Sequence, residues 1–261
     1  MNKIILKKIK EYLKETMKKS GFKIEGQRYV RVVNKQLFQY VEFQGSSGGE
    51  QFTVNIGIDC LFDKEIVNGK CSFESMRLGM IFGKGDIWWY YTDDSAKEVA
   101  HIITDFLLPI LDDCSTYSRV YQIIEKHINY IPDTDKGKDD FALELYLSKR
   151  YNPLIMLCIK LEEYDNALVC LNNYINQTKA LMENHSAYLE KMIEETPSPQ
   201  YKEKWIQMKA ECITDGQNKL QKLNILKDKI LKKDCSDVID MMNETETKNL
   251  DNLKKYLYET N

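Results

Sequence analysis

The sequence predicts an α+β domain followed by an all-helical region, and three stretches with different apolar spacing support this. Up to Gly21 the apolar residues recur every three to four positions, as on an amphipathic helix. Between residues 28 and 91 they alternate in several runs, as on half-buried strands. Beyond residue 140 the helical spacing returns, and the glycine at 216 is the only one there. We therefore expect four to five antiparallel strands flanked by helices, and then a helical hairpin.

The first elements are a helix and a series of strands. Residues 2–19 are predicted to form the helix, ended by Gly21. Strands are expected at 28–33 and 36–44, joined by a tight turn at Asn34 and Lys35, and then at 51–60. Apolar residues alternate again over 76–82, and residues 87–92, with the sequence IWWYYT, are strong strand formers.

Two helices should complete the first domain. The cap-like cluster at Asp93 and Asp94 opens the first of them, and Pro109 should kink or end it. The second is expected over roughly 116–130. The polar segment 131–140 contains Pro and Gly, so we assign it as a linker and residues 1–130 as the α+β domain.

Residues 141–261 are assigned to an all-helical domain. Residues 154–168 resemble the inner turn of one tetratricopeptide repeat, which predicts a helical hairpin but no repeat array. A long antiparallel pair is expected at about 164–195 and 200–232, because heptad-like spacing runs through both and Pro197 and Pro199 separate them. Shorter helices are expected near 236–243 and 246–259. An internal hairpin is the favoured arrangement of the long pair, and a homodimer seam is the alternative.

Composition and charge narrow the functional classes. The chain has 28 aromatic residues and no apolar run near twenty residues, which argues against disorder and against a transmembrane helix. Its seven cysteines show no CxxC pair, so we expect reduced thiols and a cytosolic location. Residues 1–40 carry eleven basic and three acidic residues, a net +8, whereas residues 86–144 carry five basic and thirteen acidic residues, a net −8.

A search for chemistry finds no catalytic, cofactor-binding or metal-binding motif. The three histidines lack metal-ligand spacing, the glycine-rich loops lack a phosphate-loop pattern, and the acidic string 133–139 departs from a calcium loop. We therefore expect a protein that is not an enzyme and has no cofactor. The alternative is an enzyme whose carboxylates meet Arg77 only in three dimensions.

The aromatic run 87–92 is the strongest candidate for a binding surface. On a strand, Trp88 and Tyr90 point to one side, and Trp89 and Tyr91 to the other. One pair should lie in the core, and the other is either covered internally or supplies a partner site. The candidate partner-binding residues are Trp88, Trp89, Tyr90, Tyr91, Asp93, Asp94 and Arg77.

The first half of the chain also resembles a bacterial family known as domain of unknown function 4304. The resemblance covers about residues 3–114 and rests on several short motifs, and the helical half has no recognised counterpart. These motifs are Gly21-Phe22-Lys23, Val41 to Gln44, Phe52 to Ile58, Arg77-Leu78-Gly79, Trp88-Trp89 and Leu107-Leu108-Pro109 with Leu111. The family has no assigned activity, so the resemblance implies a small bacterial cytosolic protein, and it suggests a toxin as the partner.

Two functions follow as expectations. The first is a protein-binding inhibitor or immunity protein, which blocks a partner by occlusion and uses the acidic stretch to attract a basic surface. The alternative is a nucleic-acid-binding component of a defence or regulatory system, suggested by the basic residues 1–40 and the aromatic strand. We expect no membrane partner.

Overall fold

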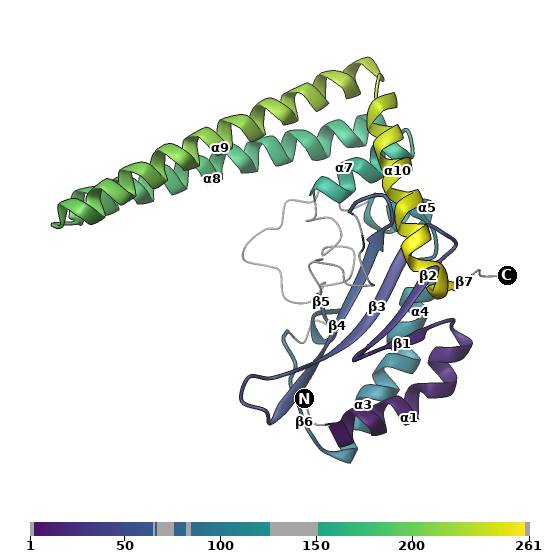
Figure 1. The fold of residues 1–261 in the computed structure, drawn as a ribbon. Helices are drawn as coiled ribbons and strands as arrows, with labels where there is room; N and C mark the ends of the chain where they lie inside the picture. The colour runs from purple at the N-terminus through teal and green to yellow at the C-terminus, as the bar shows by residue number, and fades with distance from the viewer. Residues whose placement is uncertain (1–2, 65, 67–75, 82–84, 126–150, 259–261) are drawn as a thin grey trace. The chain divides into compact units, whose positions relative to one another are not determined.

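The computed structural model describes residues 3–64, 66, 76–81, 85–125 and 151–258, and the chain divides into two compact units (Figure 1). Unit 1 comprises Met1–Pro153 and Asp237–Asn261, and unit 2 comprises Leu154–Ser236. The chain thus leaves unit 1, forms unit 2 and returns to unit 1. This order differs from the expected second domain over 141–261, and the expected linker 131–140 lies outside the described residues.

The first helix confirms the predicted spacing and its end. Helix α1 (Lys3–Lys19) buries Ile5, Ile9, Leu13 and Met17 on one face. Gly21 has a φ of 76°, and Phe22 N donates to Met17 O at 2.9 Å. This is the left-handed cap that glycine favours at a helix C-terminus.

Three long strands form the centre of the sheet, as predicted. They are β2 (Arg28–Val33), β3 (Leu37–Gly45) and β4 (Gln51–Cys60), paired antiparallel in sequence order. Asn34 and Lys35 both have positive φ, 49° and 57°, so the hairpin between β2 and β3 closes through a tight turn. The predicted fold class, an antiparallel sheet flanked by helices and followed by helices, is confirmed.

Short strands extend both edges of this sheet. At the edge of β2 lie β1 (Lys23–Glu25) and β7 (Leu257–Tyr258), and β7 runs parallel to β2. At the edge of β4 lie β5 (Met76–Arg77) and β6 (Trp89–Tyr90). Neither β1 nor β7 was predicted, because each is too short for alternation to be visible.

Two predicted strands are much shorter than expected. After β5 the chain turns into the short helix α2 (Leu78–Ile81), so the prediction of a strand over 76–82 is wrong beyond Arg77. So short an apolar run does not distinguish a strand from a helical turn. In α2 Leu78 is buried and Met80 is exposed, as expected for residues two apart on a helix. Of the run 87–92, only Trp89 and Tyr90 pair, with Phe52 and Gln51.

The helix that begins at Asp93 continues past Pro109 through a change of winding. Helix α3 (Asp93–Ile102) passes into a π-helical turn, η1 (Ile103–Leu107), and then into α4 (Leu108–Asp113), which has Pro109 in its first turn. The first turn of a helix accommodates a residue without an N–H, so Pro109 is tolerated as the second residue of α4 and the helix does not end there. Helix α5 (Tyr117–Glu125) follows, as predicted, and the rest of the expected 116–130 lies outside the described residues.

Helices cover both faces of the sheet. On one face, Gln39 Nε2 donates to Leu111 O at 2.8 Å and also to Cys114 O, which ties β3 to the end of α4. Phe38 and Tyr40 point to the opposite face and join a buried cluster with Leu253 and Tyr256. These two residues come from α10 (Ser236–Leu253) and the 3₁₀ turn η2 (Lys254–Tyr256).

The C-terminal segment differs from the two short helices that the sequence predicts there. One helix, α10, replaces the two expected at 236–243 and 246–259, and β7 follows it into the sheet. Asn249 is fully buried and anchors α10: its amide donates to Leu61 O at 2.6 Å and Lys64 O at 2.7 Å, and its Oδ1 accepts from Ile66 N at 2.6 Å. Contacts between residues nearly 190 positions apart leave no signal in local spacing.

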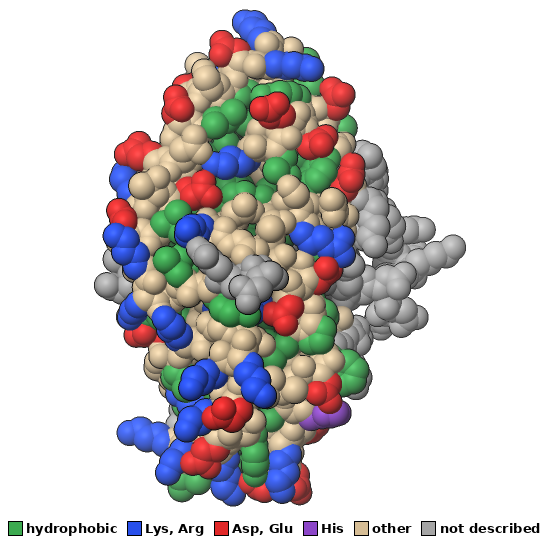
Figure 2. All heavy atoms as spheres, turned by 90° about the vertical axis from the view of Figure 1, so that its right-hand side faces the viewer, with side chains coloured by type: hydrophobic (Ala, Val, Ile, Leu, Met, Phe, Trp, Pro, Cys, Tyr) green, Lys and Arg blue, Asp and Glu red, His purple; other side chains and the backbone are tan. Residues whose placement is uncertain are grey.

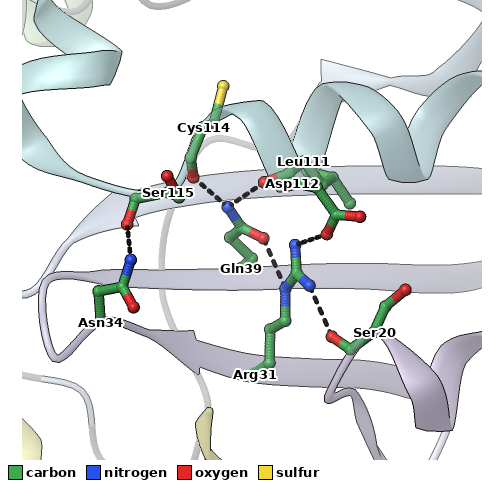
Figure 3. A network of polar contacts seen from close by, with 8 residues as sticks. All are labelled: Ser20, Arg31, Asn34, Gln39, Leu111, Asp112, Cys114 and Ser115. Atoms are coloured by element: carbon green, nitrogen blue, oxygen red, sulfur yellow. Dashed lines mark hydrogen bonds and ion pairs between the residues drawn. The ribbon is translucent and has the colours of Figure 1, made fainter. Parts of the chain in front are cut away.

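A buried arginine lies on the same face of the sheet as Gln39 and connects that face to the helices that cover it (Figure 3). Arg31 is fully buried; its Nε donates to Gln39 Oε1 at 2.8 Å, its Nη1 to Ser20 O at 2.6 Å, and its Nη2 lies 2.8 Å from Asp112 Oδ1. Burial lowers the pKa of the guanidinium, and Asp112 opposes that shift. The network therefore links the end of α1, the strands β2 and β3, and α4.

Unit 2 is the predicted helical hairpin. It contains most of α7 (Tyr151–Lys160), together with α8 (Tyr164–Glu195) and α9 (Pro199–Lys232), whose bounds agree closely with the expected long pair. Figure 1 shows α8 and α9 side by side along their length. Gly216 lies in their seam, where a Cβ would come within 2.2 Å of the Met182 sulfur. Within the described residues, no helix combines the length and the apolar character needed to cross a bilayer.

Candidate partner-binding site

An open, largely apolar pocket lies beside the aromatic run in unit 1. Its volume is about 210 Å³. The wall is formed by α2, by the loop before β6 and by one flank of α3 and η1. The lining residues are Leu78, Gly79, Ile87, Trp89, Glu98, Ile102 and Phe106. Glu98 is the only charged residue among them, so the pocket suits an apolar group with a positive charge near it.

Two local features of the chain shape this pocket. A Cβ at Gly79 would lie 2.4 Å from Gly85 O and 2.5 Å from a side-chain carbon of Ile87, so only glycine lets the two walls approach. On the opposite wall, the π-helical turn η1 contains Phe106, whose side chain is 52% exposed and meets the His101 ring edge-on. Single π turns within α-helices occur often at functional sites.

A row of polar residues crosses the sheet next to the pocket. The strand register aligns Arg28 with Glu42, Glu42 with Asn55, and Asn55 with Arg77. Arg28 Nε lies 2.7 Å from Glu42 Oε1, and Arg77 Nη1 donates to Asn55 Oδ1 at 2.8 Å. We call these four residues the polar row.

Arg77 joins the polar row to the aromatic run. Its Nε lies 3.4 Å from Asp86 Oδ1, and its guanidinium lies 5.1 Å from the centre of the Trp88 ring. Trp88 Nε1 in turn donates to Asp86 Oδ2 at 3.0 Å. Arg77 is thus held by one carboxylate, one indole and amide oxygens, an arrangement that fixes its position and half-buries it.

The four aromatic candidates separate as the alternation predicts. Trp89 is buried and packs 6.0 Å from Phe52, and Tyr91 stacks on the same ring at 5.5 Å. Trp88 is half-buried beside Arg77, and Tyr90 is 61% exposed. Trp89 and Tyr91 therefore lie on the same side, at the Phe52 ring, but only Trp89 is buried, since Tyr91 is half-buried like Trp88.

The two acidic candidates have different surroundings. Asp93 lies 2.9 Å from Lys8 Nζ and 2.8 Å from Lys97 Nζ, and it accepts a hydrogen bond from Tyr12 OH at 3.0 Å. It therefore ties α1 to α3 within unit 1. Asp94 is exposed on α3, four residues before Glu98, so the two carboxylates lie on one flank of the helix at the pocket.

The contacts of Asp93 predict a pH-dependent change in stability. Hydrogen bonds from Lys97, Lys8 and Tyr12 lower the pKa of this carboxyl well below its ordinary value of 3.8. A lowered folded-state pKa stabilises the fold above pH 3.8, and this contribution is lost as the pH falls through the folded value. We expect Asp93→Asn to lower the urea midpoint at pH 7, and the difference from wild type to shrink steadily below pH 4. A difference independent of pH would contradict this role; Asp94→Asn is the control.

Other sequence candidates are placed as follows. His101 Nδ1 lies 2.7 Å from Asp105 Oδ2, His185 is exposed on α8, and His127 and the acidic string 133–139 lie outside the described residues. Among the residues that are described, no group of three or more His, Cys, Asp or Glu side chains could hold a metal ion. The cysteines in the described part of the chain form no disulfide, and five of them are buried.

Sequence reasoning missed half of this site. It selected Arg77, Asp94 and the aromatic residues Trp88, Trp89 and Tyr90. It did not select Ile102, Phe106 or the other three residues of the polar row, which are Arg28, Glu42 and Asn55. The row depends on strand register, which alternation alone does not fix. The spacing of Ile102, Ile103 and Phe106 fits one apolar face of a regular helix, so the sequence predicted a core position for Phe106. That prediction is wrong, because Phe106 lies in the π-helical turn η1 and is 52% exposed.

Comparison with known proteins finds a family match for one part of the chain. Residues 13–113 match the model of a family described as Domain of unknown function (DUF4304), which confirms the resemblance drawn from the sequence. This segment contains the whole pocket, Arg77 and the aromatic run, whereas unit 2 and α10 lie outside it. No match was found among curated proteins or among solved structures.

Proposed function

We propose that this chain is a non-enzymatic protein-binding protein that inhibits its partner by occlusion, as an immunity protein does. The observation that carries the proposal is the open pocket lined by Trp89, Ile102 and Phe106, with the exposed Tyr90 next to Trp89 in the chain. The partner inserts an apolar side chain into the pocket and places a lysine or arginine beside Asp94 and Glu98. The rest of the contact covers the partner's surface.

The size of the pocket suits one large side chain. A cavity of about 150 Å³ lined by Leu, Ile and Phe accommodates benzene, and this pocket measures about 210 Å³. A leucine, methionine or phenylalanine side chain from a partner would therefore fit, and a drug-sized metabolite would remain largely outside.

The residues around the pocket are of the types that dominate binding energy. Tryptophan, tyrosine and arginine are enriched among hot spots, above all where neighbouring contacts exclude water. Arg77 and Trp88 hold each other in place through Asp86, so they lose little conformational entropy when a partner binds. Tyr90 is the exposed anchor beside them.

The test begins by identifying the partner at this surface. A photo-crosslinking amino acid placed at Tyr90 of the full chain in its organism of origin should capture a protein that the same probe at Ile24 does not. Ile24 is an equally exposed apolar residue on β1. The captured protein is then purified, and its binding and activity are measured directly.

The variants Tyr90→Ala and Phe106→Ala should each weaken binding about thirty-fold, the effect of removing a hot-spot side chain. Both side chains are more than half exposed, so the fold should persist, and Ile24→Ala is the control. Co-expression of the wild-type chain should suppress the partner's activity, and co-expression of the double variant should not. A partner that binds all variants equally well, or that keeps its activity when bound, would contradict the proposal.

The nucleic-acid alternative makes a different prediction for α1. In the lower part of Figure 2, where α1 faces the viewer, basic side chains lie among acidic ones. Lys7 pairs with Glu11, and Lys8 with Asp93, which reduces the positive field along this helix. A salt-dependent gel shift that weakens when Lys7, Lys8, Lys18 and Lys19 are neutralised would favour this alternative over the protein-binding function.

A further inference from the structure

The hairpin of unit 2 carries an exposed apolar stripe beside its seam. On α8, Leu181 and Tyr188 are 61% and 57% exposed and lie seven residues apart, and Tyr174 lies seven residues before Leu181. On α9, Tyr201 and Met208 are 58% and 36% exposed and also lie seven residues apart. Spacing of seven keeps residues on one helical face. We call these five residues the outer stripe.

Both halves of the outer stripe lie on the same side of the hairpin. On α8, Leu181 and Tyr188 each directly precede a seam residue, Met182 and Leu189. On α9, Met208 precedes Lys209, which reaches across the seam to Glu190. In two antiparallel helices, a residue one position before a seam residue lies on the same side of the hairpin in both. The seam faces opposite ways on the two helices, and seen from one end of the hairpin the two chains also wind in opposite senses, so the two reversals cancel.

A contact between the helices supports this placement. Lys219 directly precedes the half-buried Leu220 on α9, and its Nζ lies 4.4 Å from the centre of the Tyr174 ring on α8. These two residues meet on the flank that also carries the outer stripe. The stripe is thus a continuous feature of one hairpin face.

The seam alone buries little of α9. Leu223 and Ile230, both in its last third, are its buried residues. On α8 the buried residues cluster between Ala167 and Thr178, and Leu189 is the single one beyond them. Helices with one apolar stripe in a seam and a second stripe beside it are typical of bundles of more than two helices.

The opposite net charges of the two helices favour a second copy of the chain as the partner of the outer stripe. α8 carries two lysines against five acidic residues, a net charge of −3, and α9 carries eight lysines against four acidic residues, a net charge of +4. When two identical hairpins meet face to face about a two-fold axis, the α8 of one can lie beside the α9 of the other. Opposite charges then flank the apolar stripes, and no other protein has to be invoked.

We propose that the full chain forms a homodimer in which the outer stripes of two hairpins pack into an antiparallel four-helix bundle. The interface is isologous, so each Leu181 and Tyr188 meets apolar residues of the second copy. This surface is separate from the pocket of unit 1, and the proposal does not depend on the proposed function.

Light scattering coupled to size-exclusion chromatography of the full chain should give twice the chain mass of 30.7 kDa. The double variant Leu181→Glu, Tyr188→Glu should run as a monomer with unchanged helical circular dichroism, because it places two carboxylates among the apolar residues of the interface, where their desolvation is costly. The control is Ile225→Glu, which changes a comparably exposed residue of α9 that is not part of the outer stripe. This variant should remain a dimer. Raising the salt concentration should weaken the wild-type dimer.

A second measurement keeps the result independent of how the variant folds. Wild-type chains with normal and heavy nitrogen are mixed and treated with a carbodiimide, which joins a carboxylate to a lysine in direct contact. Crosslinks between differently labelled chains should join α8 glutamates to α9 lysines. A wild-type chain that is monomeric at about 100 μM, a dimer that survives the double variant, or interchain crosslinks confined to unit 1 would each overturn the proposal.

Discussion

Replacing Arg31 with leucine should lower the free energy of unfolding by about 3 kcal/mol or more, the usual result of breaking a buried charged network. The guanidinium is fully buried and donates to Gln39 and to the carbonyl of Ser20, and these acceptors would lose their partner inside the core. Phe22 would lose the cation that lies 4.4 Å from its ring centre. Urea unfolding followed by circular dichroism measures the change.

Arg119 provides a matched control. It makes a bidentate ion pair with Asp113, with Nη2 2.7 Å from Oδ2, but both side chains are about half exposed. Exposed pairs contribute little because water screens them, so Arg119→Leu should leave the urea midpoint nearly unchanged. Arg31→Lys should lie between the two, since an ammonium retains the charge but cannot bridge Gln39, Ser20 and Asp112 together. Equal changes in the free energy of unfolding for Arg31→Leu and Arg119→Leu would show that the buried network stabilises the fold no more than the exposed ion pair does.

The second large effect is expected at Asn249. Asn249→Ala should destabilise unit 1 by about 3 kcal/mol, because it removes three hydrogen bonds of 2.6–2.7 Å and leaves two carbonyls and one N–H of the 61–66 loop buried without them. The loop itself packs under α10: Leu61 and Ile66 belong to the same buried cluster as Leu253 and Tyr256. Thermal unfolding at one scan rate measures the loss.

Asn252 is the control for this prediction. It lies on the same helix and donates to Ile66 O at 3.2 Å, but its side chain is exposed. Asn252→Ala should cost about 1 kcal/mol or less. A chain that ends at residue 235 should lose the cooperative unfolding of unit 1 altogether, since it exposes Phe38 and Tyr40. If that shortened chain unfolds like the full chain, α10 and β7 are not part of the unit 1 core.

The sequence predicted elements whose signal is local. The turn at Asn34, the three long strands and the ends of α8 and α9 all follow from spacing, glycine and proline within a few residues. It could not predict that α10 and β7 return to the sheet, because Asn249 and Leu61 are 188 positions apart and their contact has no periodicity.

The candidate site was predicted in part for the same reason. Alternation along 87–92 correctly grouped Trp89 with Tyr91, since both contact the Phe52 ring, but only Trp89 is buried and only Trp89 and Tyr90 pair in the sheet. The pocket is lined by residues of α2 and η1, a four-residue helix and a π-helical turn, and neither is visible in the apolar spacing of the sequence. Asp93 looked like an acidic contact for a partner, yet Lys8 and Lys97 already neutralise it.

The two proposed binding surfaces lie in different units of the chain. The pocket and Tyr90 in unit 1 lie within the segment that matches the family, and the outer stripe in unit 2 lies outside it. A dimer presents two pockets, so a partner with two copies of the recognised segment would bind with higher avidity than a partner with one. The dissociation constant for a partner with one segment should be the same for the dimer and for the Leu181→Glu, Tyr188→Glu monomer.

The most direct test of the protein-binding function is calorimetric titration of the crosslinked partner, once purified, into the wild-type chain, Phe106→Ala and Ile24→Ala. The pocket is the proposed anchor site, so Kd should rise about thirty-fold for Phe106→Ala and stay unchanged for Ile24→Ala. Equal Kd values for all three chains would contradict the assignment of the pocket as the binding site.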